Sequence, residues 1–130
     1  MYLVNRRPPT LQVFDTSLGP DGFPNNNGIG VTDICRQAST LALMDTGDGE
    51  RAFVSCFLDG ELYVVDPRDG VTVDDVIQVG RGPYAVAVSP MRKKVYVTNF
   101  LEQTIAVVDA AASSPMHDRV VLRIGQPVVQ

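Results

Sequence analysis

Histidine, cysteine and tryptophan are scarce in this chain of 130 residues, which has one histidine, two cysteines and no tryptophan. The histidine, His117, stands between Met116 and Asp118 in a segment expected to connect two strands, where we expect it to be solvated rather than a metal ligand. No Cys-x-x-Cys pair occurs, which excludes zinc-ribbon and covalent haem motifs. The sequence therefore predicts no catalytic residue, no metal site and no cofactor.

Long apolar runs and an excess of positive charge are also lacking. No stretch approaches the roughly eighteen apolar residues of a membrane span, and the start of the chain has no charged segment followed by an apolar one, so no signal peptide is expected in it. Lysine and arginine number 11 against 15 aspartates and glutamates, and the net charge is -4. A nucleic-acid partner, which needs a clustered basic surface, is therefore not expected.

What the chain does contain is a repeat. Residues 2–5 (YLVN) return as residues 96–99 (YVTN), and the segments that follow them match as well. A middle copy begins at residues 53–56 (FVSC). The third strand of each copy ends in an aspartate, and these residues, Asp15, Asp66 and Asp109, lie 51 and 43 residues apart. A spacing in the forties is typical of a four-stranded propeller blade.

The longer first spacing has a visible cause. Residues 19–28 are rich in turn formers and predict an extended loop, and residues 45–49 form a smaller insertion. Oxygen-bearing side chains in the first insertion suggest calcium, but they lack the spacing of a known calcium loop, so a plain insertion is favoured. These side chains are Asp21, Asn25, Asn26 and Asn27.

Short β-branched and apolar runs bounded by glycine, proline and aspartate predict strands, and no segment of ten or more residues has helical periodicity. Several runs, such as residues 105–108 (IAVV), are apolar on both faces, which favours sheets stacked between neighbours. A β-sandwich is the rival interpretation, but it does not explain the repeat. In the order of strands within a repeat, the predicted strands are 41–44 and 86–89; 2–5, 52–56 and 95–99; 11–15, 62–66 and 105–109; and 31–35, 76–79 and 120–124.

The third copy reads GPYAVAVSP at 82–90, VYVTN at 95–99 and TIAVVD at 104–109. It resembles the YVTN family of β-propeller repeats, and the resemblance extends over nearly the whole chain, most weakly where Ser55 and Cys56 replace threonine and asparagine. The resemblance implies an all-β fold of four-stranded antiparallel blades stacked radially, in a ring of roughly seven blades. It also implies a prokaryotic protein that is exported to the periplasm or cell surface.

The chain is accordingly expected to be part of one propeller domain, with a partial blade at 1–37, a blade at 38–82, and a blade with the start of the next at 83–130. About eleven strands make an incomplete ring whose first sheet lacks its inner strand, so the remaining blades or another protomer are expected partners. Asn99 and Asp109 are expected to serve structural roles, because short polar side chains at strand ends bond to nearby backbone.

Two cysteines fall on one predicted face of the propeller. Cys35 ends the fourth strand of one repeat and Cys56 ends the second strand of the next. The connections after those strands emerge on the same face, so we expect the two residues to be close. A disulfide is expected in an oxidising compartment, and two separate buried thiols are the alternative.

The same face carries the candidate binding residues. Arg36 and Arg81 both stand between the last strand of one repeat and the first strand of the next, and planar guanidinium groups suit carboxylate or phosphate. The alternative is that the arginines pair with neighbouring acids and the phenylalanines pack beneath their loops. The candidates are Arg6, Arg7, Arg36, Phe57, Arg81 and Phe100. The opposite face is expected to be acidic, with Asp74 and Asp75 solvated.

These features favour a non-catalytic binding or scaffold propeller whose partner is a protein or a small anionic ligand. The alternative is a fragment of a propeller enzyme, such as a lactonase or lyase, with its active-site residues in other blades.

Overall fold

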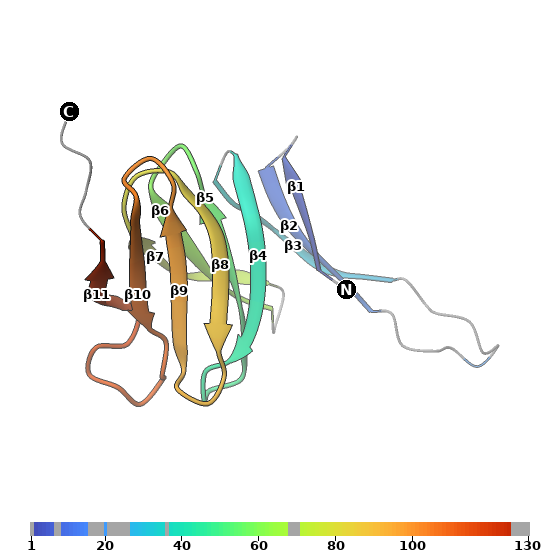
Figure 1. Cartoon of the computed structure of the whole chain (residues 1–130). Helices are drawn as coiled ribbons and strands as arrows, with labels where there is room; N and C mark the ends of the chain where they lie inside the picture. Colours follow the sequence, from blue (N-terminus) through green and yellow to red (C-terminus); the bar gives the residue numbers. More distant parts are fainter. Residues whose placement is uncertain are drawn as a thin grey trace.

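The computed structural model describes residues 2–6, 9–15, 20, 27–35, 37–67 and 71–125. These residues form eleven strands in three antiparallel sheets and no helix (Figure 1). The first sheet has three strands and the other two have four, and neighbouring strands in each sheet follow one another along the chain. The strands are β1 (Tyr2–Arg6), β2 (Pro9–Asp15) and β3 (Asn27–Asp33); β4 (Ala38–Asp45), β5 (Glu50–Cys56), β6 (Glu61–Asp66) and β7 (Thr72–Gln78); and β8 (Pro83–Ser89), β9 (Lys94–Asn99), β10 (Thr104–Asp109) and β11 (Arg119–Ile124).

The prediction of an all-β chain with about eleven strands is confirmed within this described part. The predicted starts at Val31 and Val76 are wrong, because β3 and β7 each begin four residues earlier, and those at Leu41 and Val86 are wrong because β4 and β8 each begin three residues earlier. In β7 only Ile77 is buried, since the strand lies at a sheet edge and faces solvent. An edge strand of this kind needs no continuous apolar run, so its first half carries Asp74 and Asp75 instead.

The repeat extends to the irregularities of the sheets. The pairing of β2 with β3 shifts register between Val13 and Phe14, and the two later sheets shift at the equivalent residues before Asp66 and Asp109. A β-bulge at one position in all three copies bends each outer strand in the same way. The three sheets are therefore copies of one structural unit and not merely of one sequence pattern.

The middle sheet is buried on both sides. One core cluster joins it to the first sheet through Leu11, Val54 and Val65. A second cluster joins it to the third sheet through Phe53, Val64 and Val97, among others. Strand β5 consequently has six consecutive buried residues, as expected for a strand that is apolar on both faces.

The sheets approach one another most closely along their first strands. Strand β4 lies along β8, and β5 also contacts β8, whereas the outermost strands β7 and β11 scarcely meet (Figure 1). The connections 57–60, 79–82 and 100–103 lie at the end that is uppermost in Figure 1, which we call the upper rim. The connections 46–49, 90–93 and 110–118 form the lower rim.

No helix in the described part of the chain is long and apolar enough to cross a membrane.

Candidate functional site

Asn99, at the end of β9, links two segments of the upper rim through hydrogen bonds of its side chain. The side chain is fully buried, and Nδ2 donates to the carbonyl oxygen of Val79 at 3.0 Å and to Oγ1 of Thr104 at 3.2 Å. Gly80 leaves room for it, because a Cβ at that position would lie 2.4 Å from Nδ2 of Asn99. Asn99 thus has the predicted structural role, but the backbone that it bonds lies in the connection between two sheets, and across the adjacent turn it bonds the side chain of Thr104.

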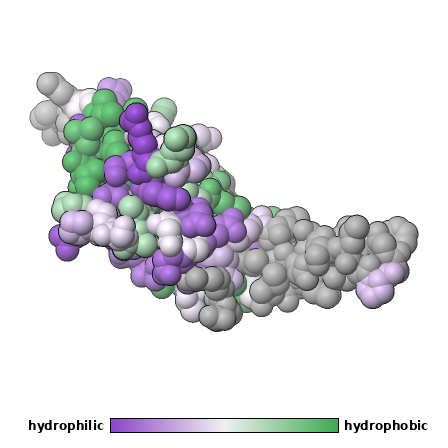
Figure 2. Space-filling view, turned by 90° about the horizontal axis from the view of Figure 1, so that it is seen from below, coloured by the Kyte–Doolittle hydropathy of each residue, from purple (hydrophilic) through white to green (hydrophobic). Residues whose placement is uncertain are grey.

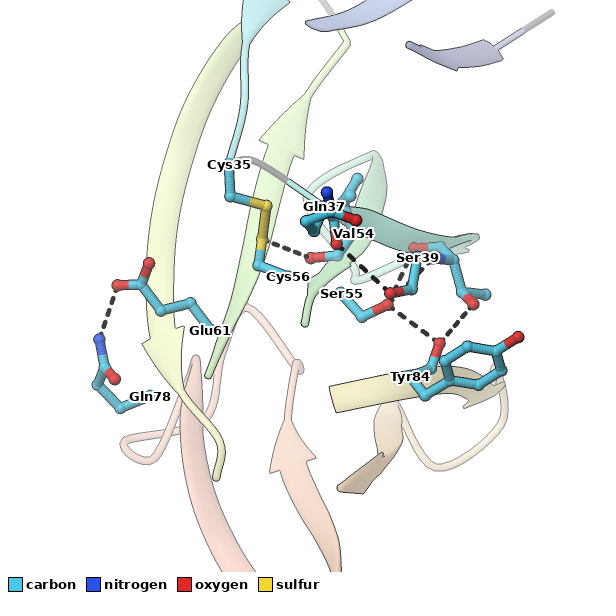
Figure 3. Close-up of a disulfide and its surroundings, with 10 residues drawn as sticks. Cys35, Gln37, Ser39, Val54, Ser55, Cys56, Glu61, Gln78 and Tyr84 are labelled. Carbon is cyan, nitrogen blue, oxygen red and sulfur yellow. Dashed lines mark hydrogen bonds between the residues drawn. A yellow bond between two sulfur atoms is a disulfide. The ribbon is translucent and has the colours of Figure 1, made fainter. Parts of the chain in front are cut away.

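A disulfide occupies the equivalent place between the first two sheets. Cys56 stands opposite Ala38 as Asn99 stands opposite Pro83, and Cys35 and Gly80 each precede those partners by three residues. Cys35 and Cys56 are bonded, with their Cα atoms 5.9 Å apart (Figure 3). Both cysteines of the chain are thus used in one bond, which fixes β5 to the segment that enters its sheet.

Two phenylalanines begin equivalent loops on this rim. The amide of Phe57 donates to the carbonyl of Gln37 at 3.2 Å, and the amide of Phe100 donates to that of Gly82 at 2.7 Å. Gln37 and Gly82 share a left-handed backbone, with φ of 56° and 68°. This shared backbone turn places both phenylalanines at the start of their loops on the upper rim.

A groove with a volume of about 400 Å³ opens on the upper rim between the second and third sheets. Its walls are the 57–60 loop, the 80–82 segment, Leu101 and the side chains of Gln78 and Arg123. Arg81 and Arg123 are its cations, and Asp59 is the only acid among the described residues that line it. The groove therefore has positive charge beside apolar and aromatic surface.

The two arginines differ in how they are held. Nη1 of Arg123 donates to the carbonyl of Val79 and lies 3.6 Å from Oε2 of Glu102, so this guanidinium is fixed in place. Arg81 is exposed and makes no ion pair with any residue that the structure describes. Pairing with neighbouring acids, the alternative considered from the sequence, is therefore not found for Arg81 among the described residues, and Arg123, which was not a candidate, makes such a pair.

An apolar hollow of about 450 Å³ lies next to this groove and is lined by Phe57, Tyr84 and Phe100. Phe100 is 67 % exposed, so its ring does not pack beneath its loop, whereas Phe57 is half-buried. Tyr84 is 60 % exposed. The backbone of Tyr84 is anchored, because its carbonyl accepts from Oγ1 of Thr40 at 2.6 Å and Oγ of Ser55 at 3.3 Å (Figure 3). Phe57 contributes to both the groove and the hollow and so joins the two surfaces.

Of the predicted binding residues, the structure brings Phe57, Arg81 and Phe100 together on the upper rim. Arg7 and Arg36 lie outside the described residues, and of Arg6 only the backbone in β1 is described. The sequence interpretation missed Arg123 and Tyr84. A charged residue inside the apolar run 120–124 (VVLRI) was the available signal for Arg123.

The lower rim holds charged pairs that stabilise the fold. Oδ2 of Asp109 accepts from Oγ of Ser114 at 2.6 Å, and Oδ1 accepts from the amide of Ala111 at 3.1 Å and lies 3.3 Å from Nζ of Lys94. Burial raises the pKa of Asp109, but these hydrogen bonds and the Lys94 ammonium outweigh burial and hold it below its usual value. Asp109 thus caps the turn that follows it, as its position predicts.

One expectation about this rim is wrong. His117 was expected to be solvated, yet it is half-buried, and its neighbour Asp118 is only 8 % exposed. The reason is that the end of the connection 110–118 lies beside β7, where His117 and Asp118 come close to Asp74, and the amide of Asp118 donates to the carbonyl of Asp109 at 2.6 Å.

No protein-family model and no curated protein matches this chain. The function therefore has to rest on the geometry of the described surfaces.

Proposed function

We propose that this chain is part of a non-catalytic β-propeller that binds an anionic group of a partner at the upper rim. The three copied sheets, their shared bulge and their approach along the first strands support radial stacking of blades. The disulfide Cys35–Cys56 supports a place in an oxidising compartment, either the periplasm or the cell surface.

The observation that supports binding is the guanidinium of Arg81, which is exposed and makes no ion pair with any residue in the described part of the chain. It shares a groove with the fixed guanidinium of Arg123, so two cations face one space of about 400 Å³. Two planar donors converging on a small volume suit a carboxylate or a phosphate. The adjoining hollow of Phe57, Tyr84 and Phe100 offers contact area to an apolar or aromatic neighbour of that anion.

A labelled peptide with one glutamate beside a phenylalanine is the probe for this site, and the same peptide with glutamine is its neutral control. We expect the glutamate peptide to bind more tightly and inorganic phosphate to compete with it. Arg81→Ala should weaken binding at least about tenfold, because a charge-assisted hydrogen bond is lost. Arg92→Ala is the matched control, since Arg92 is also exposed but lies on the lower rim.

Equal affinity for the two peptides, or an equal loss in the Arg92→Ala variant, would contradict the proposal. Fluorescence anisotropy measures each affinity, and repeating it at higher salt tests the ionic contribution, which should weaken as salt screens exposed charges.

A further inference from the structure

The lower rim brings together three side chains that can ligate a metal. Asp74 comes from β7, and His117 and Asp118 come from the connection that leads to β11. One donor atom from each lies within 4.8 Å of those of the other two. Ligand atoms of a single Zn²⁺ lie roughly 3–4 Å apart, because each is about 2.0–2.2 Å from the ion. Asp74 is exposed, so a small shift of its side chain brings all three to one ion.

Asp118 gives an independent indication of a ligand. Its side chain is 4 % exposed, and Oδ2 lies 3.0 Å from Nε2 of His117. Oδ1 is also buried and has no hydrogen-bond partner among the described residues, and the same is true of Nδ1 of His117. Buried polar atoms are ordinarily paired, and a buried carboxylate oxygen without a partner is strongly disfavoured. Two such atoms meet in the one cluster of described residues that has metal-ligand spacing.

The negative charge around the cluster also favours a bound cation. The carboxylates of Asp74 and Asp75 both lie near that of Asp118. Three carboxylates thus gather beside one imidazole. Figure 2, which views the molecule from this side, shows hydrophilic side chains spread across the lower rim.

A neighbouring cation compensates this charge only in part. Nε of Arg51 lies 3.4 Å from Oδ2 of Asp74, but the same guanidinium lies 3.2 Å from Asp48 and 3.6 Å from Asp66. Arg51 therefore serves three acids at once, and none of the ion pairs described for it reaches Asp118. A divalent ion would supply the missing positive charge.

We propose that Asp74, His117 and Asp118 bind a divalent transition-metal ion of the Zn²⁺ type, with Asp75 as a further carboxylate beside them. Imidazole together with carboxylates suits Zn²⁺, whereas Ca²⁺ takes about six to eight oxygens. The ion would fasten the connection 110–118 to β7. The ion would add a link between the outer edges of the second and third sheets, because the outermost strands β7 and β11 have few contacts with each other.

The single histidine of the chain makes the test specific. Protein stripped with a chelator is titrated with ZnCl₂ at neutral pH without reductant, by calorimetry and by NMR of the imidazole resonances. We expect saturable binding of one ion that shifts the His117 ring resonances. Asp118→Asn and His117→Gln should each weaken binding at least about tenfold. Glu50→Gln is the matched control, because Glu50 is an exposed carboxylate on the same rim and is not in the cluster.

Thermal unfolding separates loss of the site from loss of the fold. Without metal, Asp118→Asn should unfold no earlier than the wild type, because it removes a buried charge that lacks a full set of partners. Added Zn²⁺ should raise the unfolding temperature of the wild type and of Glu50→Gln but not that of Asp118→Asn. Absence of zinc binding to the wild type, or binding that leaves the His117 resonances unchanged, would overturn the proposal.

Discussion

Cys56 and Asn99 occupy the same register position at the ends of β5 and β9, and each fastens its strand to the connection that enters its sheet. Asn99 does so through a hydrogen bond to Val79, and Cys56 does so through a covalent bond to Cys35. The middle copy of the repeat departs from the asparagine pattern at this residue. The structure gives the reason, since a disulfide there replaces a buried amide.

Replacing the buried amide should loosen the upper rim. Asn99→Ala removes the hydrogen bonds to Val79 and Thr104, so that the carbonyl of Val79 keeps only the bond from Arg123. We expect a loss of about 1–3 kcal/mol in the free energy of unfolding, measured by urea denaturation. Thr98→Ala is the control, because Thr98 is the exposed neighbour in the same strand. A similar small change in both variants would show that the amide contributes nothing.

Replacing the disulfide with the glycine and asparagine found in the third sheet tests whether the two links are equivalent. Cys35→Ser with Cys56→Ser opens a cross-link spanning 21 residues, which should cost about 3 kcal/mol on the chain-entropy model. Cys35→Gly with Cys56→Asn installs the residues found at Gly80 and Asn99, so it should recover part of that loss. Denaturation curves of the two double variants give the comparison. Equal stability of the two would refute the equivalence, and two reactive thiols in the denatured, unreduced wild type would refute the bond itself.

Asp109 should make stability depend on pH in the acid range. Its pKa is lower in the folded chain than in the unfolded chain, where it is about 3.9. The ionised carboxylate therefore contributes stability above the unfolded value, and this contribution disappears as the pH falls through the lowered folded value. Asp109→Asn should destabilise the protein by about 1–3 kcal/mol at neutral pH. The difference from the wild type should shrink in strong acid, and a difference independent of pH would contradict this role.

The strands were predictable because a strand covered on both faces is apolar throughout, and β5, β6 and β10 have this pattern. The starts of β3 and β7 were not, since an edge strand that faces solvent carries polar residues such as Asp74. The repeat placed Arg81, Phe57 and Phe100 on one rim, because equivalent positions in a repeat share a face.

The remaining features depend on contacts between sheets. Arg123 lines the groove because its guanidinium extends from β11 to the carbonyl of Val79, in the connection between the second and third sheets. Asp74 and Asp118 are far apart in the sequence, and only the folding of the connection 110–118 against the outer strand of the preceding sheet brings them together. A histidine between polar residues in a loop gives no sign of this proximity, so the sequence alone suggested solvation.

Reversing the charge of Arg81 tests the proposed binding site most directly. In Arg81→Glu the groove would keep Arg123, already engaged by Val79 and Glu102, and would gain an acid at its mouth. The measurement is the affinity of this variant for the glutamate peptide and for the same peptide with lysine. We predict a loss of at least about a hundredfold for the glutamate peptide and a preference for the lysine peptide. Unchanged affinity for the glutamate peptide, or an equal loss in Arg92→Glu on the lower rim, would contradict binding at this groove.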